Sequence, residues 1–134
     1  MSVLAQIFAL ITAFVHVLAF TWEVVLWQRP GVHQGIFQVS TADLPPVRLW
    51  SFNVGFYNLF LAAGPIVGVV AWHLDYATVA RTLVIYCCSF MALAGVMLFV
   101  SDRLAMSRPK GAGVGGAAAQ CLPALVAVVL TSMG

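Results

Sequence analysis

The sequence predicts an all-α, polytopic membrane protein, an antiparallel bundle of four transmembrane helices in a single domain (residues 1–134). Three observations predict this class. Hydrophobic residues make up 63% of the chain. Charged residues make up only 7%, whereas a water-facing surface needs roughly 25–35%. The apolar residues also run continuously, without the alternation of a membrane β-barrel. This composition excludes an ordinary soluble enzyme, a disordered chain and a nucleic-acid-binding protein with a basic face.

Four apolar stretches are long enough to cross a bilayer, which takes about 20 residues per helix. They cover approximately residues 3–27, 49–73, 77–101 and 114–133. Arg29-Pro30-Gly31 is expected to end the first helix, because Pro and Gly both disrupt helices. Leu44-Pro45-Pro46 is expected to precede the second. The first stretch lacks the positive start and the cleavage site of a signal peptide, which predicts a helix retained in the protein.

The few basic residues predict the orientation of the bundle in the membrane. Loops 28–48 and 102–113 share one face, and the opposite face carries Arg81 alone. The basic residues of the two loops are Arg29, Arg48, Arg103, Arg108 and Lys110. The positive-inside rule therefore places both loops in the cytoplasm and both termini outside. Aromatic residues near the expected helix ends, Trp27 among them, are expected to anchor the protein at the membrane–water interface.

Polar residues inside the spans carry the functional information, because hydrocarbon disfavours polar groups that face lipid. His16 and Glu23 are seven residues apart in the first span, which places them on one helix face about 10 Å apart. Asn53 and Tyr57 are four residues apart and share a face of the second span. Asn58 is rotated from that face.

Together with Gln120 of the fourth span, these residues lie in the cytoplasmic half of the expected bundle. We therefore expect a polar pocket around Glu23 that opens toward the cytoplasm. Glu23 is the candidate general acid or proton carrier, with His16 as a second candidate catalytic residue. The alternative for Glu23 is snorkelling to the interface, or a structural hydrogen bond to Asn53 or Gln120. The candidate ligand-binding residues are Asn53, Tyr57, Asn58 and Gln120.

No metal ligands occur at metal-binding spacing, and the sequence identifies no cofactor. Three segments carry a resemblance to a known family: Glu23 to Trp27, Asn53 to Gly64, and Gln120 to Ala124. They resemble the DUF1304 family of small bacterial integral membrane proteins of unknown function. Within the second segment Val54 and Leu59 stand where the family often has Gln and Gly. The resemblance implies four membrane helices, and it brings no established activity. The expected location of the chain is the bacterial cytoplasmic (inner) membrane.

Four functions remain open at this stage. The pocket around Glu23 binds a lipophilic small molecule, or it catalyses an isomerase-like or cyclase-like proton transfer on a lipid or isoprenoid. Alternatively, a homo-oligomer transports a small solute or protons. In the fourth alternative the polar residues lock the bundle of a structural or accessory protein, since interhelical hydrogen bonds average only about 0.6 kcal/mol. The expected partners are the lipid bilayer, a lipophilic small molecule and further copies of the chain.

Overall fold

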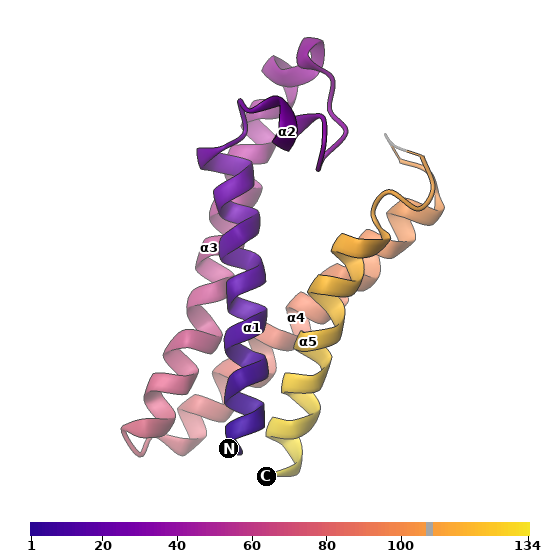
Figure 1. Cartoon of the computed structure of the whole chain (residues 1–134). Helices are drawn as coiled ribbons and strands as arrows, with labels where there is room; N and C mark the ends of the chain where they lie inside the picture. The colour runs from indigo at the N-terminus through magenta and orange to yellow at the C-terminus, as the bar shows by residue number, and fades with distance from the viewer. Residues whose placement is uncertain (107–108) are drawn as a thin grey trace.

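The computed structural model describes residues 1–106 and 109–134 and confirms the all-helical fold, with no strand in the described residues (Figure 1). Among these residues four helices are long and apolar enough to cross a membrane. The four spans are Val3–Val25, Thr41–His73, Ala77–Arg103 and Val114–Met133. The chain is therefore a membrane-spanning helical protein, as its composition predicts.

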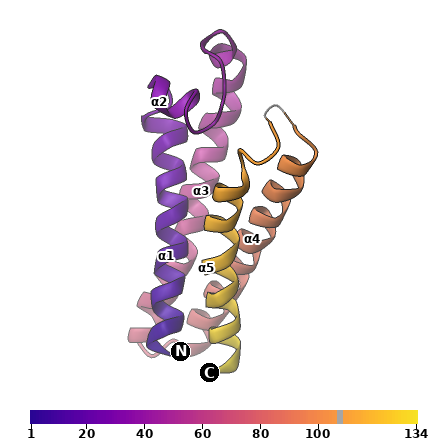
Figure 2. The same ribbon diagram turned by 45° about the vertical axis from the view of Figure 1, so that its right-hand side comes forward.

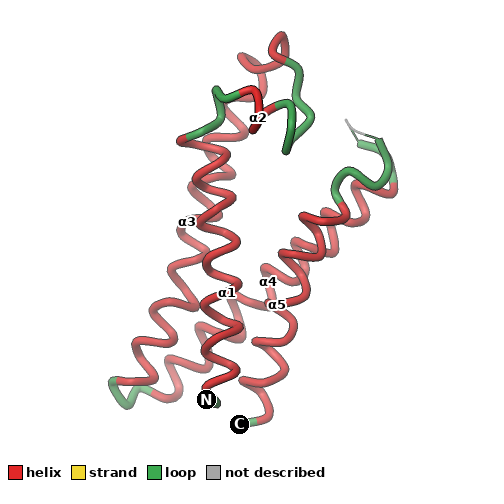
Figure 3. The backbone as a smooth tube through the Cα atoms, viewed as in Figure 1, coloured by secondary structure: helices red, strands yellow, loops and turns green. Residues whose placement is uncertain are grey.

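The long helices are joined by connections of unequal length (Figure 3). Helix α1 (Val3–Phe20) runs directly into a short π-helix, η1 (Thr21–Val25). The connection that follows contains α2 (Pro30–His33) and a 3-10 turn, η2 (Thr41–Asp43). The remaining three helices are α3 (Leu44–His73), α4 (Ala77–Arg103) and α5 (Val114–Met133).

The helix α3 begins earlier than the sequence suggests. Its first residue is Leu44, so Pro45 and Pro46 lie inside the first turn. Proline is tolerated there because the first backbone N–H groups of a helix have no partner within it. At its other end α3 turns into α4 through Asp75, whose positive φ of 64° allows a tight antiparallel connection.

The four long helices form two pairs that meet at one end of the molecule. Helix α1 packs along α3, and α4 packs along α5. Both termini and the α3–α4 connection lie at one end, which we call the terminal end (Figure 2). The connections after η1 and after α4 lie at the opposite end, which we call the loop end. The pair α1–α3 and the pair α4–α5 spread apart toward the loop end (Figure 1).

Small side chains build the core at the terminal end. The buried cluster consists of Met1, Ala5, Ala9, Val84, Cys88, Met91, Ala92, Ala124 and Ala127. Alanines let helices approach closely, which is how helices commonly associate in membranes. Gly68 serves the same purpose between α3 and α4, because a Cβ there would lie 2.8 Å from Val84 Cγ2 and 3.1 Å from the Ala80 carbonyl oxygen. We call this region the packed half.

Candidate functional site

The π-helical turn η1 positions Glu23. The Leu26 backbone N–H donates to the Thr21 carbonyl oxygen, five residues back, at 2.9 Å. Gly55 of α3 lies directly against this turn: a Cβ at Gly55 would be 2.5 Å from Val24 Cγ2 and 3.1 Å from Glu23 Cβ. The absence of a side chain at Gly55 thus lets α3 approach the widened turn. Single π-helical turns occur frequently at functional sites.

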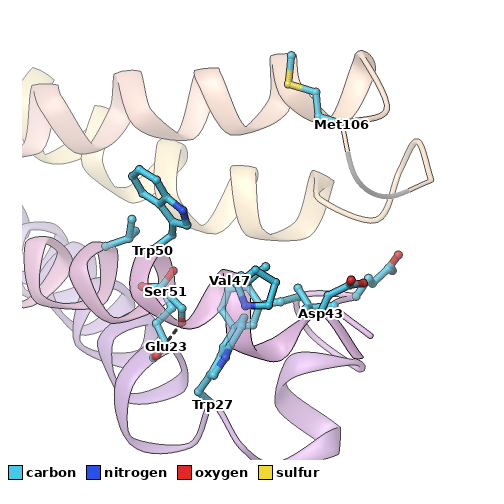
Figure 4. Close-up of a pocket in the computed structure, with 12 residues that line it drawn as sticks. Glu23, Trp27, Asp43, Val47, Trp50, Ser51 and Met106 are labelled. Carbon is cyan, nitrogen blue, oxygen red and sulfur yellow. Dashed lines mark hydrogen bonds between the residues drawn. The ribbon is translucent and has the colours of Figure 1, made fainter. Parts of the chain in front are cut away.

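Two hydrogen bonds tie Glu23 to α3. Its carboxylate oxygen Oε2 accepts from Asn58 Nδ2 at 2.8 Å. Its backbone carbonyl oxygen accepts from the Ser51 hydroxyl at 2.7 Å, the contact drawn as a dashed line in Figure 4. The second bond matters because the carbonyl groups at the end of a helix lack partners within it. Glu23 is therefore held in place through its backbone and its side chain together.

His16 is almost completely buried, with 1% of its surface exposed. Its Nδ1 lies 3.0 Å from the Thr12 carbonyl oxygen. A carbonyl oxygen only accepts, so Nδ1 carries the proton of this hydrogen bond. In the neutral ring Nε2 then bears a lone pair, and it has no hydrogen-bond partner among the described residues. A buried polar atom without a partner is rare in folded proteins.

A cavity of about 1130 Å³ separates the two helix pairs toward the loop end. Its polar lining includes His16, Glu23, Tyr57, Asn58 and Gln120. Most other lining residues are apolar or aromatic, among them Val15, Leu18, Trp22, Phe60, Leu61, Phe90 and Leu98. The wall formed by α5 consists of the small residues Gly115, Gly116 and Ala119 beside Gln120. An apolar cavity with a few convergent polar groups is the usual form of a small-molecule site.

A second cavity of about 470 Å³ lies nearer the loop end (Figure 4). It is lined by Trp27, Gln38, Asp43, Trp50 and Ser51, with Met106 contributed from beyond the end of α4. Glu23, Phe37 and Val54 line both cavities. The carboxyl of Glu23 therefore belongs to the wall between a mostly apolar cavity and a more polar one.

Trp27, which its position near a helix end predicts to be an interfacial anchor, packs inside the protein. Only 5% of its surface is exposed, and its ring packs edge-on against Phe37 with 5.3 Å between the centroids. Its indole N–H has no partner among the described residues. His33, which the sequence does not single out, is buried beside it, and His33 Nδ1 lies 3.1 Å from the Trp27 carbonyl oxygen.

The structure brings together five of the six candidate site residues. His16, Glu23, Tyr57, Asn58 and Gln120 line the larger cavity. Asn53 does not line either cavity and its side chain is exposed. The amide bonded to Glu23 belongs to Asn58, where the sequence suggested Asn53 or Gln120. The catalytic and ligand-binding roles of these residues remain predictions.

Asp102 is a buried acid that sequence reasoning placed in a loop. It lies in the last turn of α4 with 0% of its surface exposed. Its carboxylate accepts from the backbone N–H of Gly113 at 2.7 Å and from that of Gly111 at 2.9 Å. It also forms an ion pair with Arg103. A carboxylate at a helix C-terminus opposes the helix dipole, which is the signal in the sequence that could have identified it.

The described residues contain no group of three or more His, Cys, Asp or Glu side chains placed to hold a metal ion. The geometry is that of a small polytopic membrane protein with a carboxyl group in the wall shared by two cavities. Residues 10–132 match the family described as "Protein of unknown function (DUF1304)", and the chain belongs to this family. The match confirms the resemblance of the three sequence segments. No curated protein and no solved structure matches the chain.

Proposed function

We propose that this protein binds a lipophilic small molecule in the larger cavity, beside Glu23. The observation that carries the proposal is the cavity itself. Its volume of about 1130 Å³ lies just above the range of roughly 300–1,000 Å³ of typical small-molecule pockets, so it has room for a long hydrocarbon chain. Its apolar and aromatic walls fit a hydrocarbon, and its polar groups gather at one side.

The state of the Glu23 carboxyl supports binding over a purely structural role. A carboxylate that only locks helices together is expected to have both oxygens paired in a close-packed core. Here Oε2 accepts from Asn58, while Oε1 has no hydrogen-bond partner among the described residues. The cavity lies next to it. Glu23 therefore has capacity for one further partner.

We further propose that the protein resides in the bacterial inner membrane with its loop end in the cytoplasm. Toward that end lie Arg29, directly before α2, Arg48, in the second turn of α3, Arg103, the last residue of α4, and Lys110, in the connection after α4. Arg81 lies in the second turn of α4, near the terminal end. Ser107 and Arg108 of the predicted cytoplasmic loop lie outside the described residues. The excess of basic residues supports this orientation through the positive-inside rule. Both cavities then belong to the cytoplasmic side of the bundle.

A membrane enzyme is the second candidate, favoured by one observation. Glu23 and His16 line the same apolar cavity, which is the arrangement that an isomerase-like or cyclase-like proton transfer on a lipid or isoprenoid requires. Transport by an oligomer is less well supported, because the buried cluster in the packed half is apolar.

Binding can be measured with tritiated 1-dodecanol and the full chain in nanodiscs of phosphatidylcholine, with empty nanodiscs as the blank. We expect saturable binding to the wild type. The substitution Ala119→Trp inserts a large ring from the cavity wall, and we expect it to weaken binding by at least about tenfold, equivalent to about 1.4 kcal/mol.

The matched control is Leu122→Trp. This residue lies on the same helix, 60% exposed and outside both cavity walls. We expect it to bind dodecanol like the wild type. Unsaturable uptake, or equal affinity of the Ala119→Trp and wild-type proteins, contradicts the proposed site.

A further inference from the structure

We propose that the ligand is a lipophilic cation, an ammonium group on a hydrocarbon chain, with its head at Glu23 and its chain in the larger cavity. This inference rests on the proposed function and adds the charge of the ligand to it. It follows from three features of the two cavities: where they meet, which charges face them, and which rings surround the meeting point.

The two cavities meet at Glu23. This residue, Phe37 and Val54 line both, so a ligand lying in the larger cavity brings one end against the Glu23 carboxyl. Beyond Glu23 the smaller cavity contributes Ser51, Gln38 and Asp43, which are polar. The apolar length on one side and the polar space on the other fit an amphiphile with a single compact head.

The charges that face the cavities are acidic. Glu23 and Asp43 are carboxyl groups, and the described lining residues include no Lys or Arg. Arg103, at the end of α4, is instead paired with Asp102. An anionic head such as a carboxylate or phosphate meets like charge here without a compensating cation. A cationic head gains attraction from Glu23, which is stronger inside a bundle than in water.

Aromatic rings surround the meeting point. Trp22 lines the larger cavity, Trp27 and Trp50 line the smaller one, and Phe37 lines both. Figure 4 shows Trp27 and Trp50 flanking the site around Glu23 and Ser51. Indole and phenyl faces attract ammonium groups, and such aromatic surroundings are a common way to recognise quaternary ammonium ligands. Aromatic residues and a carboxyl thus converge on the place where the head would lie.

The test uses three probes with the same twelve-carbon chain and different heads. Radiolabelled dodecyltrimethylammonium is bound to the full chain in phosphatidylcholine nanodiscs, and dodecanol and dodecanoate are used as competitors. We expect saturable binding of the cation, at least about tenfold tighter than that of dodecanol. Dodecanoate is expected not to compete at concentrations where dodecanol does.

The variant that isolates the charge is Glu23→Gln, which keeps the size of the side chain. We expect it to weaken cation binding by at least about tenfold while dodecanol binding changes by less than about threefold. The matched control is Asp75→Asn, which removes a carboxyl at the terminal end, where a positive φ of 64° suits Asn. We expect the control to leave both affinities unchanged.

The outcomes separate this inference from the proposed function. If dodecanol binds saturably and the cation binds no more tightly, or if Glu23→Gln leaves cation binding intact, the ligand's head is not cationic and only this inference is overturned. If dodecanoate binds most tightly, the charge assignment is reversed and equally overturned. If none of the three probes binds saturably, both this inference and the proposed site are overturned.

Discussion

The packed half and the opposite half of the bundle, which contains the larger cavity and which we call the cavity half, both contain glycines on long helices, with opposite consequences. In the packed half Gly68 lets α3 approach α4 so closely that a Cβ would overlap Val84. In the cavity half Gly115 also lies on a long helix, yet a Cβ there would meet nothing within 4 Å. A small residue therefore makes contact where a neighbouring helix lies against it, and makes space where the neighbour diverges.

The difference teaches where stability and function reside in so small a protein. Among the described residues, the largest side chain that is fully buried is Met91, which lies in the packed half among alanines from three helices. The cavity half contains Glu23, His16 and the larger cavity that they line. We expect substitutions in the first region to change the free energy of unfolding, and substitutions in the second to change ligand binding.

The largest effect is expected from adjacent residues on α4 that belong to the two regions. Met91 is fully buried in the packed half, whereas Phe90 is 56% exposed and lines the larger cavity. Met91→Ala is expected to lower the free energy of unfolding by about 2–5 kcal/mol, because it leaves a void in the core. Phe90→Ala removes a larger side chain and is expected to cost less than about 1 kcal/mol. Unfolding in mixed micelles measures both, and equal losses would contradict the division.

An intermediate effect, with opposite signs, is expected at the two glycines. Gly68→Ala forces α3 away from Val84 and the Ala80 carbonyl and is expected to cost about 1–3 kcal/mol. Gly115→Ala meets no neighbour and is expected to stabilise the helix by up to about 1 kcal/mol. Thermal unfolding in a mild detergent compares the two. A stabilised Gly68→Ala protein would show that the helices in the packed half are less closely packed than described.

The smallest effect is expected for the hydrogen bond between Asn58 and Glu23. A double-mutant cycle with Asn58→Ala and Glu23→Ala is expected to give a coupling energy of about 0.6 kcal/mol, the average for interhelical bonds in membranes. Asn53 is exposed and outside the cavities, so the same cycle with Asn53→Ala is expected to give no coupling. Mixed-micelle unfolding provides the free energies, and equal coupling at both positions would break the assignment of Asn58 to this half.

The spans and the family could be predicted from the sequence because hydrophobic length and the Asn53 to Gly64 segment are local signals. The sequence could not predict that Asn58, and not Asn53, bonds to Glu23, because this depends on which face of α3 meets η1. That face is set by Gly55, which contacts Val24 and Glu23 across the two helices. Hydrophobic periodicity identifies a helix and leaves its rotation against a neighbour undetermined.

Local sequence also does not predict the π-helical turn or the residue at which α3 begins. Nothing in Thr21–Val25 distinguishes a π-turn from an α-turn by residue type, and the widened turn is accompanied by contact with Gly55 and a bond from Ser51. Pro45 and Pro46 suggest a non-helical segment before a helix, although a helix can also begin with prolines in its first turn. In both cases tertiary packing or context selects between two conformations that the sequence permits.

The Asp102 carboxylate joins the end of α4 to the backbone just before α5. These two helices are therefore connected at the loop end, and we call them the α4–α5 arm. Its pivot lies where Gly68 of α3 touches Val84. From Val84 to Arg103 the α4–α5 arm extends about 28 Å at 1.5 Å per residue. A rotation of about 5° at the pivot would therefore move the loop end of this arm by about 2.5 Å, because the arm is about 28 Å long at 1.5 Å per residue. A small change in the packing at Gly68 would therefore produce a larger change in the width of the cavity at the loop end.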